Sequence, residues 1–209
     1  MATDISGAVL VGGASRRMGQ DKAMMRFGGA PLIARAVEAL RPVVQEILIV
    51  GRRAARFAWL PGVHWFEDIL PPIGPLAGIY TALQYAQSPY CLIVACDMPF
   101  LSPSLLSFLA DAAGGWDAVV PEIDGRLQPL HAVYSRSCLP AIEEMLAVGQ
   151  HCPLDLYPRV RTRFVTAEEL RIVDRRLLSF LNVNTPAEWQ TALALLEEQT
   201  VRASCSHLP

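Results

Sequence analysis

Glycine and basic residues cluster directly after the first apolar run of the chain. Residues 10–22 read LVGGASRRMGQDK. The glycines let the backbone turn sharply and come close to a ligand, and exposed backbone N–H groups in such a turn bind anions. Arg16, Arg17 and Lys22 add positive charge: a lysine meets a phosphate as a point charge, and an arginine can bind it through two hydrogen bonds. The stretch therefore predicts a phosphate-binding loop.

The same stretch does not match two common nucleotide-binding patterns. A P-loop has its lysine directly after the second glycine, whereas Lys22 comes three residues after Gly19. The dinucleotide fingerprint G-x-G-x-x-G does not occur in the stretch. A plain glycine turn with solvated arginines is the competing interpretation. The glycines, the three basic residues and the Ser15 hydroxyl together favour phosphate binding.

The carboxylate of Asp97 follows the apolar run 90–95 almost directly. Ligands of open α/β sheets bind beyond the carboxyl ends of the strands. Magnesium commonly takes one or two carboxylates and fills its other positions with water and substrate phosphates. Asp97 is therefore a candidate magnesium ligand, with a helix-capping aspartate as the alternative.

These residues need strands and helices that bring them to one edge of a sheet. Short apolar runs predict strands, and apolar residues at helical spacing predict helices between them. Strands are expected over 5–11, 46–50, 62–66, 90–95, 118–120, 130–134 and 163–165, and helices over 31–40, 75–86, 103–112, 136–148 and 186–198. This alternation predicts a three-layer α/β domain with a mostly parallel central sheet.

Length and composition limit the class of protein. The 209 residues carry a formal net charge of −2, and 52% of them are hydrophobic, which excludes a disordered chain. One domain is expected over residues 1–200, with a frayed tail over 201–209. The near-neutral charge argues against nucleic-acid binding, and no apolar run is long enough to cross a membrane.

The N-terminus and the cysteines indicate the compartment. Residues 1–13 have no basic region before their apolar run, so they predict a buried strand rather than a signal peptide. The five cysteines are odd in number and form no C-x-x-C pair. Free thiols in a reducing cytosol are therefore expected, and we predict a cytoplasmic protein.

The loop after the first strand resembles the signature L-x-G-G-x-S-x-R-M-G-x-D-K of the MobA-like nucleotidyltransferases. The matching residues are Leu10, Gly12, Gly13, Ser15, Arg17, Met18, Gly19, Asp21 and Lys22. Further segments that resemble the family are GPLAG at 74–78, CDMPF at 96–100, QPLHAVY at 128–134 and NVNTP at 182–186. The similarity extends to about Trp189, and it implies the Rossmann-like nucleotidyltransferase fold.

The resemblance also implies a reaction. Family members that act on the molybdenum cofactor transfer GMP from GTP to molybdopterin, use Mg²⁺ and release pyrophosphate. The expected partners are GTP, molybdopterin, and the molybdoenzymes or other cofactor-biosynthesis proteins that receive the product. Gly12 and the GPLAG segment favour GTP over CTP, because pyrimidine-using relatives usually differ at both places.

Roles for individual residues follow from the same resemblance. It implies catalysis by Arg17, Lys22 and Asp97, with Asp97 also holding Mg²⁺. It implies nucleotide binding by Leu10, Val11, Gly12, Gly13, Ser15, Gly19, Lys22, Asp68, Gly74, Gly78 and Asp97, and an acceptor-side position in the active site for Asn182 and Asn184. No general base is expected, because a phosphate nucleophile is already ionised near neutral pH.

Several of these residues also have ordinary structural interpretations. Asp68 can be a loop carboxylate, and the glycines of GPLAG can serve close packing of a helix on the sheet. Asn184 or Thr185 can cap the last helix. His131 lies in a strand-like run, where a histidine is more often structural than catalytic.

Three alternative functions remain open at the level of sequence. The first is a cytidylyltransferase, or another nucleotidyltransferase of the family, with a different phosphorylated acceptor. The second is a non-catalytic nucleotide-binding regulator, which the presence of both Lys22 and Asp97 disfavours. The third is an NAD-dependent oxidoreductase, which lacks its fingerprint. One departure from the family is the sequence VGRR at 50–53, so no nucleotide contact is assigned there.

Overall fold

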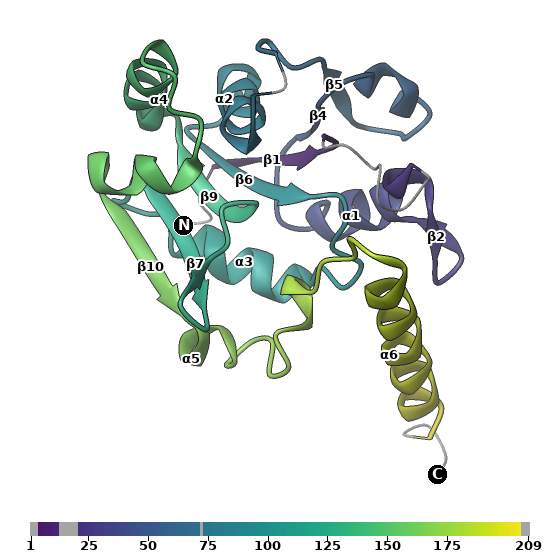
Figure 1. Cartoon of the computed structure of the whole chain (residues 1–209). Helices are drawn as coiled ribbons and strands as arrows, with labels where there is room; N and C mark the ends of the chain where they lie inside the picture. Colours follow the sequence, from purple (N-terminus) through teal and green to yellow (C-terminus); the bar gives the residue numbers. More distant parts are fainter. Residues whose placement is uncertain (1–3, 13–20, 72, 206–209) are drawn as a thin grey trace.

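The computed structural model describes residues 4–12, 21–71 and 73–205 of the chain. An eight-stranded sheet lies between two layers of helices (Figure 1). The strands are β1 (Ile5–Leu10), β2 (Arg26–Phe27), β3 (Ala30–Pro31), β4 (Ile47–Val50), β5 (His64–Phe66), β6 (Tyr90–Ala95), β7 (Ala118–Ile123), β8 (Arg126–Leu127), β9 (His131–Ser135) and β10 (Thr162–Thr166), of which β2 and β3 form a separate hairpin. The helices are α1 (Leu32–Leu40), α2 (Pro75–Tyr85), α3 (Pro103–Asp111), α4 (Leu139–Ala147), α5 (Ala167–Leu170) and α6 (Pro186–Cys205), with 3-10 turns η2 (Lys22–Met24), η3 (Ala54–Phe57), η4 (Arg136–Cys138), η5 (Pro153–Arg159) and η6 (Leu178–Phe180).

The strand order in the main sheet is β10-β7-β9-β6-β1-β4-β5, with β8 paired to β7. The strands β6, β1, β4 and β5 are parallel neighbours, and β9 runs antiparallel to the strands on both sides of it. Leu10 lies between Val50 of β4 and Ala95 of β6 in register, so these strands end at one edge. The structure thus confirms the α/β fold with a mostly parallel central sheet.

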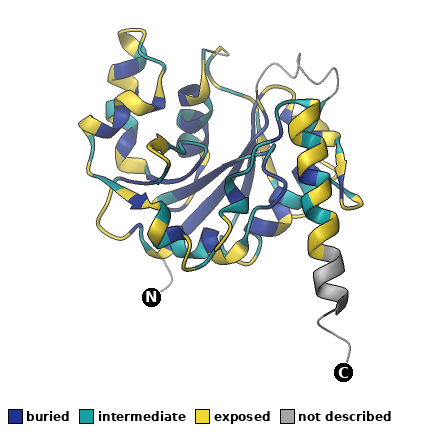
Figure 2. Ribbon diagram, turned by 60° about the horizontal axis from the view of Figure 1, so that its bottom comes forward, coloured by how far each residue is buried: buried dark blue, intermediate teal, exposed yellow. Residues whose placement is uncertain are grey.

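Helices cover both faces of the sheet, which explains why its strands are apolar throughout. The helices α1 and α3 pack against Val9, Ile49 and Val94 on one face. The helices α2 and α4 pack against Leu10 and Ile93 on the other face, at the top of Figure 1. Buried residues accordingly line the central strands in Figure 2.

A smaller third core joins the hairpin β2–β3 to α6. The ring of Phe27 makes edge contacts with Phe100 and Trp189, at centroid distances of 5.2 and 5.6 Å. The sequence pattern did not predict this hairpin, because each strand has only two residues. The last helix also continues to Cys205, beyond residue 198 where the apolar period ends. The single domain over 1–200 remains a prediction, and residues 206–209 of the expected frayed tail lie outside the described residues.

The described part of the chain contains no helix long and apolar enough to cross a membrane. Four cysteines in this part, Cys91, Cys96, Cys138 and Cys152, are free thiols, as expected from the sequence.

Candidate active site

Lys22 lies where three distant parts of the chain meet. Its Nζ donates a hydrogen bond to Oδ1 of Asn184 at 2.6 Å and lies 3.4 Å from Oδ2 of Asp97. The side chains of Lys22 and Asp97 are 16% and 20% exposed. Lys22 is also the only lysine of the chain, which has 17 arginines among its 18 basic residues. The structure therefore brings together Lys22, Asp97 and Asn184, three of the residues expected in the site.

The position of Asp97 is fixed by the main chain on two sides. Asp97 follows β6, and the preceding Cys96 donates its backbone N–H to the carbonyl of Leu10 in β1, at 3.3 Å. The carbonyl of Asp97 accepts a hydrogen bond from the backbone N–H of Val183, at 3.0 Å. The carboxylate is thus held between the end of the parallel sheet and the segment that leads to α6.

The side chain of Asn184 can bind Lys22 because the cap of α6 is made by the Thr185 and Glu188 side chains. Oε2 of Glu188 accepts the backbone N–H groups of Asn184 and Thr185, at 2.7 and 2.9 Å. Oγ1 of Thr185 accepts the backbone N–H of Glu188 at 3.2 Å. These hydrogen bonds lower the pKa of Glu188, and the bond from the Asn184 backbone has the largest effect. The capping residue is therefore Thr185. The sequence offered Asn184 or Thr185 as this cap, and the spacing of Thr185 to Glu188 is the signal that distinguishes the two.

Asn182 occupies a different position from Asn184. Its Oδ1 is buried and has no hydrogen-bond partner within the described ranges. The segment before it is anchored by Ser179, whose backbone N–H bonds to Oδ2 of Asp174 at 2.9 Å and whose hydroxyl donates to the carbonyl of Phe100 at 3.2 Å. No hydrogen bond in the described part of the chain joins Asn182 to Lys22 or Asp97, and its role in the acceptor site remains a prediction.

His131 is fully buried next to this segment. Its ring lies 4.4 Å from the ring of Phe180, with a tilt of 34°. Burial lowers the pKa of His131 to about 3, against smaller opposing effects from the Ser179 backbone and Asp174. The imidazole is therefore neutral at neutral pH. Its position agrees with the structural interpretation.

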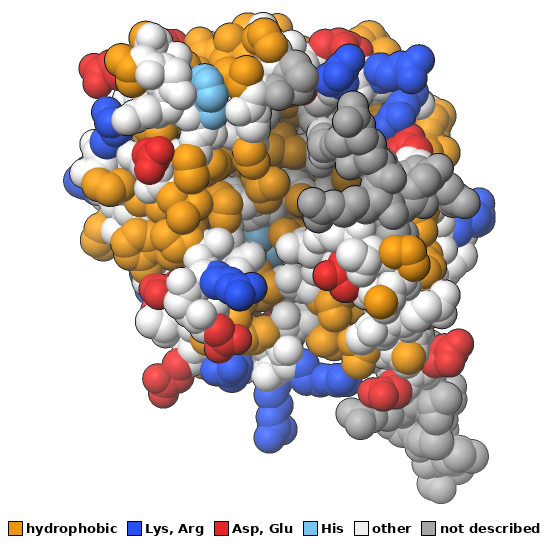
Figure 3. Space-filling view, in the orientation of Figure 1, with side chains coloured by type: hydrophobic (Ala, Val, Ile, Leu, Met, Phe, Trp, Pro, Cys, Tyr) orange, Lys and Arg blue, Asp and Glu red, His pale blue; other side chains and the backbone are white. Residues whose placement is uncertain are grey.

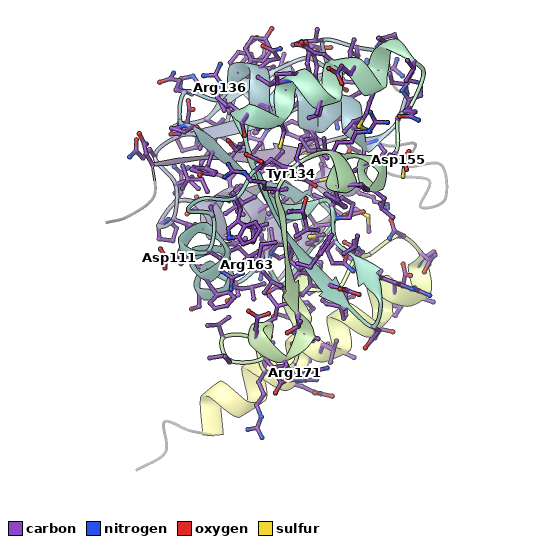
Figure 4. The ribbon with its side chains drawn as sticks, turned by 90° about the vertical axis from the view of Figure 1, so that its left-hand side faces the viewer. Asp111, Tyr134, Arg136, Asp155, Arg163 and Arg171 are labelled. Carbon is purple, nitrogen blue, oxygen red and sulfur yellow. The ribbon has the colours of Figure 1, made fainter. Side chains whose placement is uncertain are left out.

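The turn before His131 is held at the active-site edge by the sheet and by a buried tyrosine. The backbone N–H of Ala95 donates to the carbonyl of Leu130 at 3.0 Å. Tyr134, which lies in the interior in Figure 4, donates its hydroxyl to the carbonyl of Pro129 at 2.9 Å. The same hydroxyl is 3.0 Å from that of Tyr157 in η5. These contacts fix residues 129 and 130 beside the end of β6.

The described start of the glycine-rich loop continues the sheet. The backbone N–H of Val11 bonds to the carbonyl of Val50 at 2.8 Å. Gly12 is exposed, and a Cβ built on it would meet no atom within 4 Å among the described residues. Gly13, Ser15 and Gly19, which are expected to bind the nucleotide, and Arg17, which is expected in catalysis, lie outside the described residues, so their roles remain predictions.

Gly51 explains the segment to which the sequence assigned no contact. Its φ of +145° is one that residues with a side chain rarely adopt, and a Cβ there would lie 2.6 Å from the carbonyl oxygen of Val11. The chain after β4 therefore passes directly against the end of β1. The glycine gives a close backbone approach at Val11, where the predicted phosphate-binding loop begins.

The two glycines of the GPLAG segment have packing roles in the structure. Gly74 has a φ of +133°, and a Cβ on it would lie 3.3 Å from the carbonyl oxygen of His151. A Cβ on Gly78 would lie 3.0 Å from Cδ1 of Leu10. The contact of Gly78 supports close packing of α2 on the sheet, and that of Gly74 shows a close backbone approach between the start of α2 and the segment at His151. Contact of Gly74 or Gly78 with a base remains a prediction.

Asp68 follows β5 at the same edge of the sheet. Its carboxyl is partly buried, and the pKa of Asp68 is raised by this burial and by the nearby Glu67, while Arg52 acts in the opposite direction. Two strands, β4 and β1, separate β5 from β6 in the sheet. Within the described ranges no hydrogen bond or ion pair joins Asp68 to Lys22 or Asp97, so its part in nucleotide binding remains a prediction.

The arrangement defines a class of protein. A mostly parallel sheet presents, beyond the ends of adjacent strands, a lysine and a carboxylate, which are groups that bind phosphates and the cations that accompany them. This is the arrangement of an α/β nucleotidyltransferase.

Comparisons with known proteins agree with this class. Residues 7–160 match the model of the MobA-like NTP transferase domain. A probable molybdenum cofactor guanylyltransferase from Pelotomaculum thermopropionicum is 40% identical over 192 residues, which cover 92% of this chain and 93% of that protein. One from Carboxydothermus hydrogenoformans is 36% identical, with coverages of 90% and 94%. The crystal structure of molybdopterin-guanine dinucleotide biosynthesis protein A from Archaeoglobus fulgidus gives a TM-score of 0.81 at 30% identity, covering 92% of this chain and 99% of that one. The chain belongs to the MobA-like NTP transferase family and is a nucleotidyltransferase.

Proposed function

We propose that this nucleotidyltransferase transfers GMP from GTP to molybdopterin, forming the guanine dinucleotide form of the molybdenum cofactor and releasing pyrophosphate. The observation that carries the proposal is the contact of Lys22 with both Asp97 and Asn184 at the ends of β1 and β6. The relatives that carry the guanylyltransferase name match over nearly their whole length, which supports the same substrates for this chain.

The residues around Asp97 fit a magnesium ion that is shared with the substrate. The described residues contain no group of three or more His, Cys, Asp or Glu that could hold a metal by themselves. Oδ2 of Asp97 faces Lys22, and Oδ1 makes no hydrogen bond within the part of the chain that the structure describes. One free carboxylate oxygen suits Mg²⁺, because this ion is usually completed by substrate phosphates and water.

In the proposed reaction, an oxygen of the molybdopterin phosphate attacks the α-phosphorus of GTP. The new P–O bond forms as the bond from the α-phosphorus to the bridging oxygen of pyrophosphate breaks, and the pyrophosphate carries away the electron pair. Bound Mg²⁺ would neutralise phosphate charge and orient the two reactants. Lys22, positioned by Asn184, stabilises the charge that develops on the phosphoryl oxygens. Arg17 and the amides of the glycine-rich loop complete this charge stabilisation in the proposal.

The proposal extends to the surroundings of the enzyme. Free thiols such as Cys91 and Cys138 stay reduced in the cytoplasm, where we place the reaction. Molybdoenzymes, or other proteins of cofactor biosynthesis, would receive the guanine dinucleotide product.

Pyrophosphate release tests the function directly. The purified chain is incubated with Mg²⁺, molybdopterin and each of the four nucleoside triphosphates in turn. We expect release with GTP and molybdopterin together, and little with either alone. Preferential use of CTP would replace the proposal by the cytidylyltransferase alternative. Tight GTP binding without release of pyrophosphate would instead indicate a regulator.

Variants of Lys22 separate catalysis from a passive charge. Loss of one preorganised donor costs on the order of 10²–10³ in rate, so Lys22→Ala should slow pyrophosphate release by about this factor while its circular dichroism spectrum is unchanged. Lys22→Arg should restore only part of the rate, because a planar fork does not replace a compact ammonium. A change in KM alone would remove Lys22 from the catalytic residues.

A further inference from the structure

The carboxylate next to Lys22 has its own partner. Oδ2 of Asp21 lies 2.6 Å from Nη1 of Arg56, and Oδ1 of Asp21 accepts a hydrogen bond from Nη2 of Arg56 at 3.2 Å. Each terminal nitrogen of the guanidinium thus contacts one oxygen of the carboxylate. This bidentate geometry makes a strong arginine–carboxylate ion pair. Arg56 belongs to η3, between β4 and β5, and none of the roles assigned above includes it or Asp21.

The guanidinium of Arg56 stacks over the aromatic ring of Phe57. Its Cζ lies 4.5 Å from the ring centroid of Phe57, and Phe57 is fully buried. A guanidinium over such a ring gains electrostatic attraction and loses freedom of movement. Lys and Arg side chains gather at the upper right of the molecule in Figure 3, in the region of β5 and the turn before it. The fork of Arg56 is therefore held in a fixed place, in a segment that also carries Arg52 and Arg53.

Asp21 connects this arginine to the phosphate-binding turn. Asp21 precedes η2, its carbonyl accepts the backbone N–H of Met24 at 3.0 Å, and its side chain makes no capping bond to its own turn. The next residue is Lys22, whose ammonium reaches Asp97 and Asn184. The carboxylate that Arg56 binds is therefore at the base of the turn that carries Lys22.

An unpaired carboxylate at this place would oppose binding of an anionic substrate. Asp21 directly precedes Lys22, whose ammonium lies 3.4 Å from Oδ2 of Asp97, so the Asp21 carboxylate stands beside the residues at the end of β6. The triphosphate of a nucleotide must approach the same place. A negative charge there repels it unless a cation cancels that charge.

We propose that Arg56 is a positioning residue of the nucleotide site, which fixes Asp21 and cancels the negative charge that Asp21 would otherwise present to the triphosphate. The proposal rests on the proposed function only in taking GTP as the substrate. Arg56 acts through Asp21 and touches none of the reacting atoms.

The test compares Arg56→Gln with a matched pair elsewhere. Arg163 and Glu169 form an ion pair of 3.1 Å with side chains 35% and 37% exposed, close to the 37% and 34% of Arg56 and Asp21. Arg163 lies in β10, at the far edge of the sheet from η3 (Figure 4). Arg163→Gln therefore controls for the loss of a half-exposed arginine pair with no link to the site.

We expect Arg56→Gln to raise KM for GTP by about tenfold and to change kcat less, because lost charge compensation weakens binding of ground state and transition state alike. The defect should shrink between about 0.05 M and 0.5 M salt, since ions screen such a repulsion. Asp21→Asn together with Arg56→Gln removes the unpaired charge and should return KM to within about threefold of the wild-type value. Arg56→Lys should rescue partly, because it keeps the charge and loses the fork.

The single lysine gives a readout that does not depend on turnover. Reductive methylation followed by peptide mapping reports the accessibility of Lys22 alone among the side-chain amines. Arg56→Gln should change the rate of Lys22 methylation because it frees the neighbouring Asp21 carboxylate, and Arg163→Gln should leave the rate unchanged. GTP affinity is measured by calorimetry on unmethylated portions of the same protein preparations.

The outcomes separate the two proposals. A wild-type chain that binds GTP but releases no pyrophosphate would contradict the proposed function, and the comparisons of GTP affinity and methylation would still test Arg56. The role of Arg56 would be overturned if the wild type binds GTP and releases pyrophosphate, and Arg56→Gln and Arg163→Gln give the same KM and the same methylation rate. It would also be overturned if the double variant Asp21→Asn/Arg56→Gln has a KM as high as that of Arg56→Gln.

Discussion

The hydrogen bond from Lys22 to Asn184 allows the effect of a substitution to be worked out in advance. Asn184→Ala removes an acceptor that lies 2.6 Å from the ammonium, and a hydrogen bond to a charged group contributes about 1.5–3 kcal/mol. The freed ammonium can then close on Asp97, from 3.4 Å to about 2.8 Å, which returns about 1 kcal/mol at an effective dielectric constant of about 20. The net loss is about 0.5–2 kcal/mol, or about 2- to 30-fold in kcat/KM.

A double-mutant cycle shows whether Asn184 acts through Lys22. In the Lys22→Ala background there is no ammonium to position, so adding Asn184→Ala should change kcat/KM by less than about twofold. Asn182→Ala is the matched control, because no hydrogen bond in the described part of the chain joins Asn182 to Lys22, and its effect should be the same in both backgrounds. The constants come from pyrophosphate release at varied GTP. If Asn184→Ala costs as much without Lys22 as with it, Asn184 contacts substrate directly and the reasoning is refuted.

Three further predictions follow from the geometry. Asp97→Asn should abolish turnover in Mg²⁺ without changing the circular dichroism spectrum, and near-normal turnover would contradict the metal role. His131→Leu should flatten the pH dependence of stability: the folded chain holds the pKa of His131 at about 3, against about 6.5 when unfolded, so the stability of the wild type falls as pH drops below 6.5. Denaturation in urea should show that the free energy of unfolding falls by about 2 kcal/mol more in the wild type than in the variant between pH 7 and pH 5. Equal falls in the two proteins would show that His131 can take a proton while folded. Gly51→Ala should cost at least about 1–3 kcal/mol of unfolding free energy, whereas Gly114→Ala, where a Cβ meets nothing within 4 Å in the described structure, should be nearly neutral; similar midpoints for the two variants would contradict the strain argument.

The central sheet was predictable from sequence because its strands are buried on both faces. The run 90–95 was predicted with both boundaries, since every residue from Tyr90 to Ala95 is apolar. The elements that were missed are short and depend on tertiary contacts. The hairpin β2–β3 is held by the packing of Phe27 on Phe100 and Trp189, and β8 is a two-residue strand after a turn. Local patterns carry little information about such elements.

The position of a site residue was predictable where it follows the end of a strand. It was less predictable where a distant segment of the chain packs back against that strand end. Asp97 follows directly from the end of β6. The contact between Lys22 and Asn184 spans 162 residues, and no local pattern encodes it. At Gly74 and Gly78 the structure shows close approaches to His151 and Leu10, and the ligand contacts that the family motif implies remain a prediction.

The contact between Lys22 and Asn184 also bears on the order in which a working enzyme arises during synthesis. The family match covers residues 7–160, so the recognisable domain is translated before Asn184 leaves the ribosome. Until then Asp97 is the one described side chain that pairs with Lys22, and the hairpin β2–β3 lacks the Trp189 ring that packs on it. A nascent chain can thus complete its main sheet before the amide that fixes the Lys22 side chain has been added. The arrangement of Lys22, Asp97 and Asn184 is therefore complete only after the segment that leads into the last helix has been synthesised.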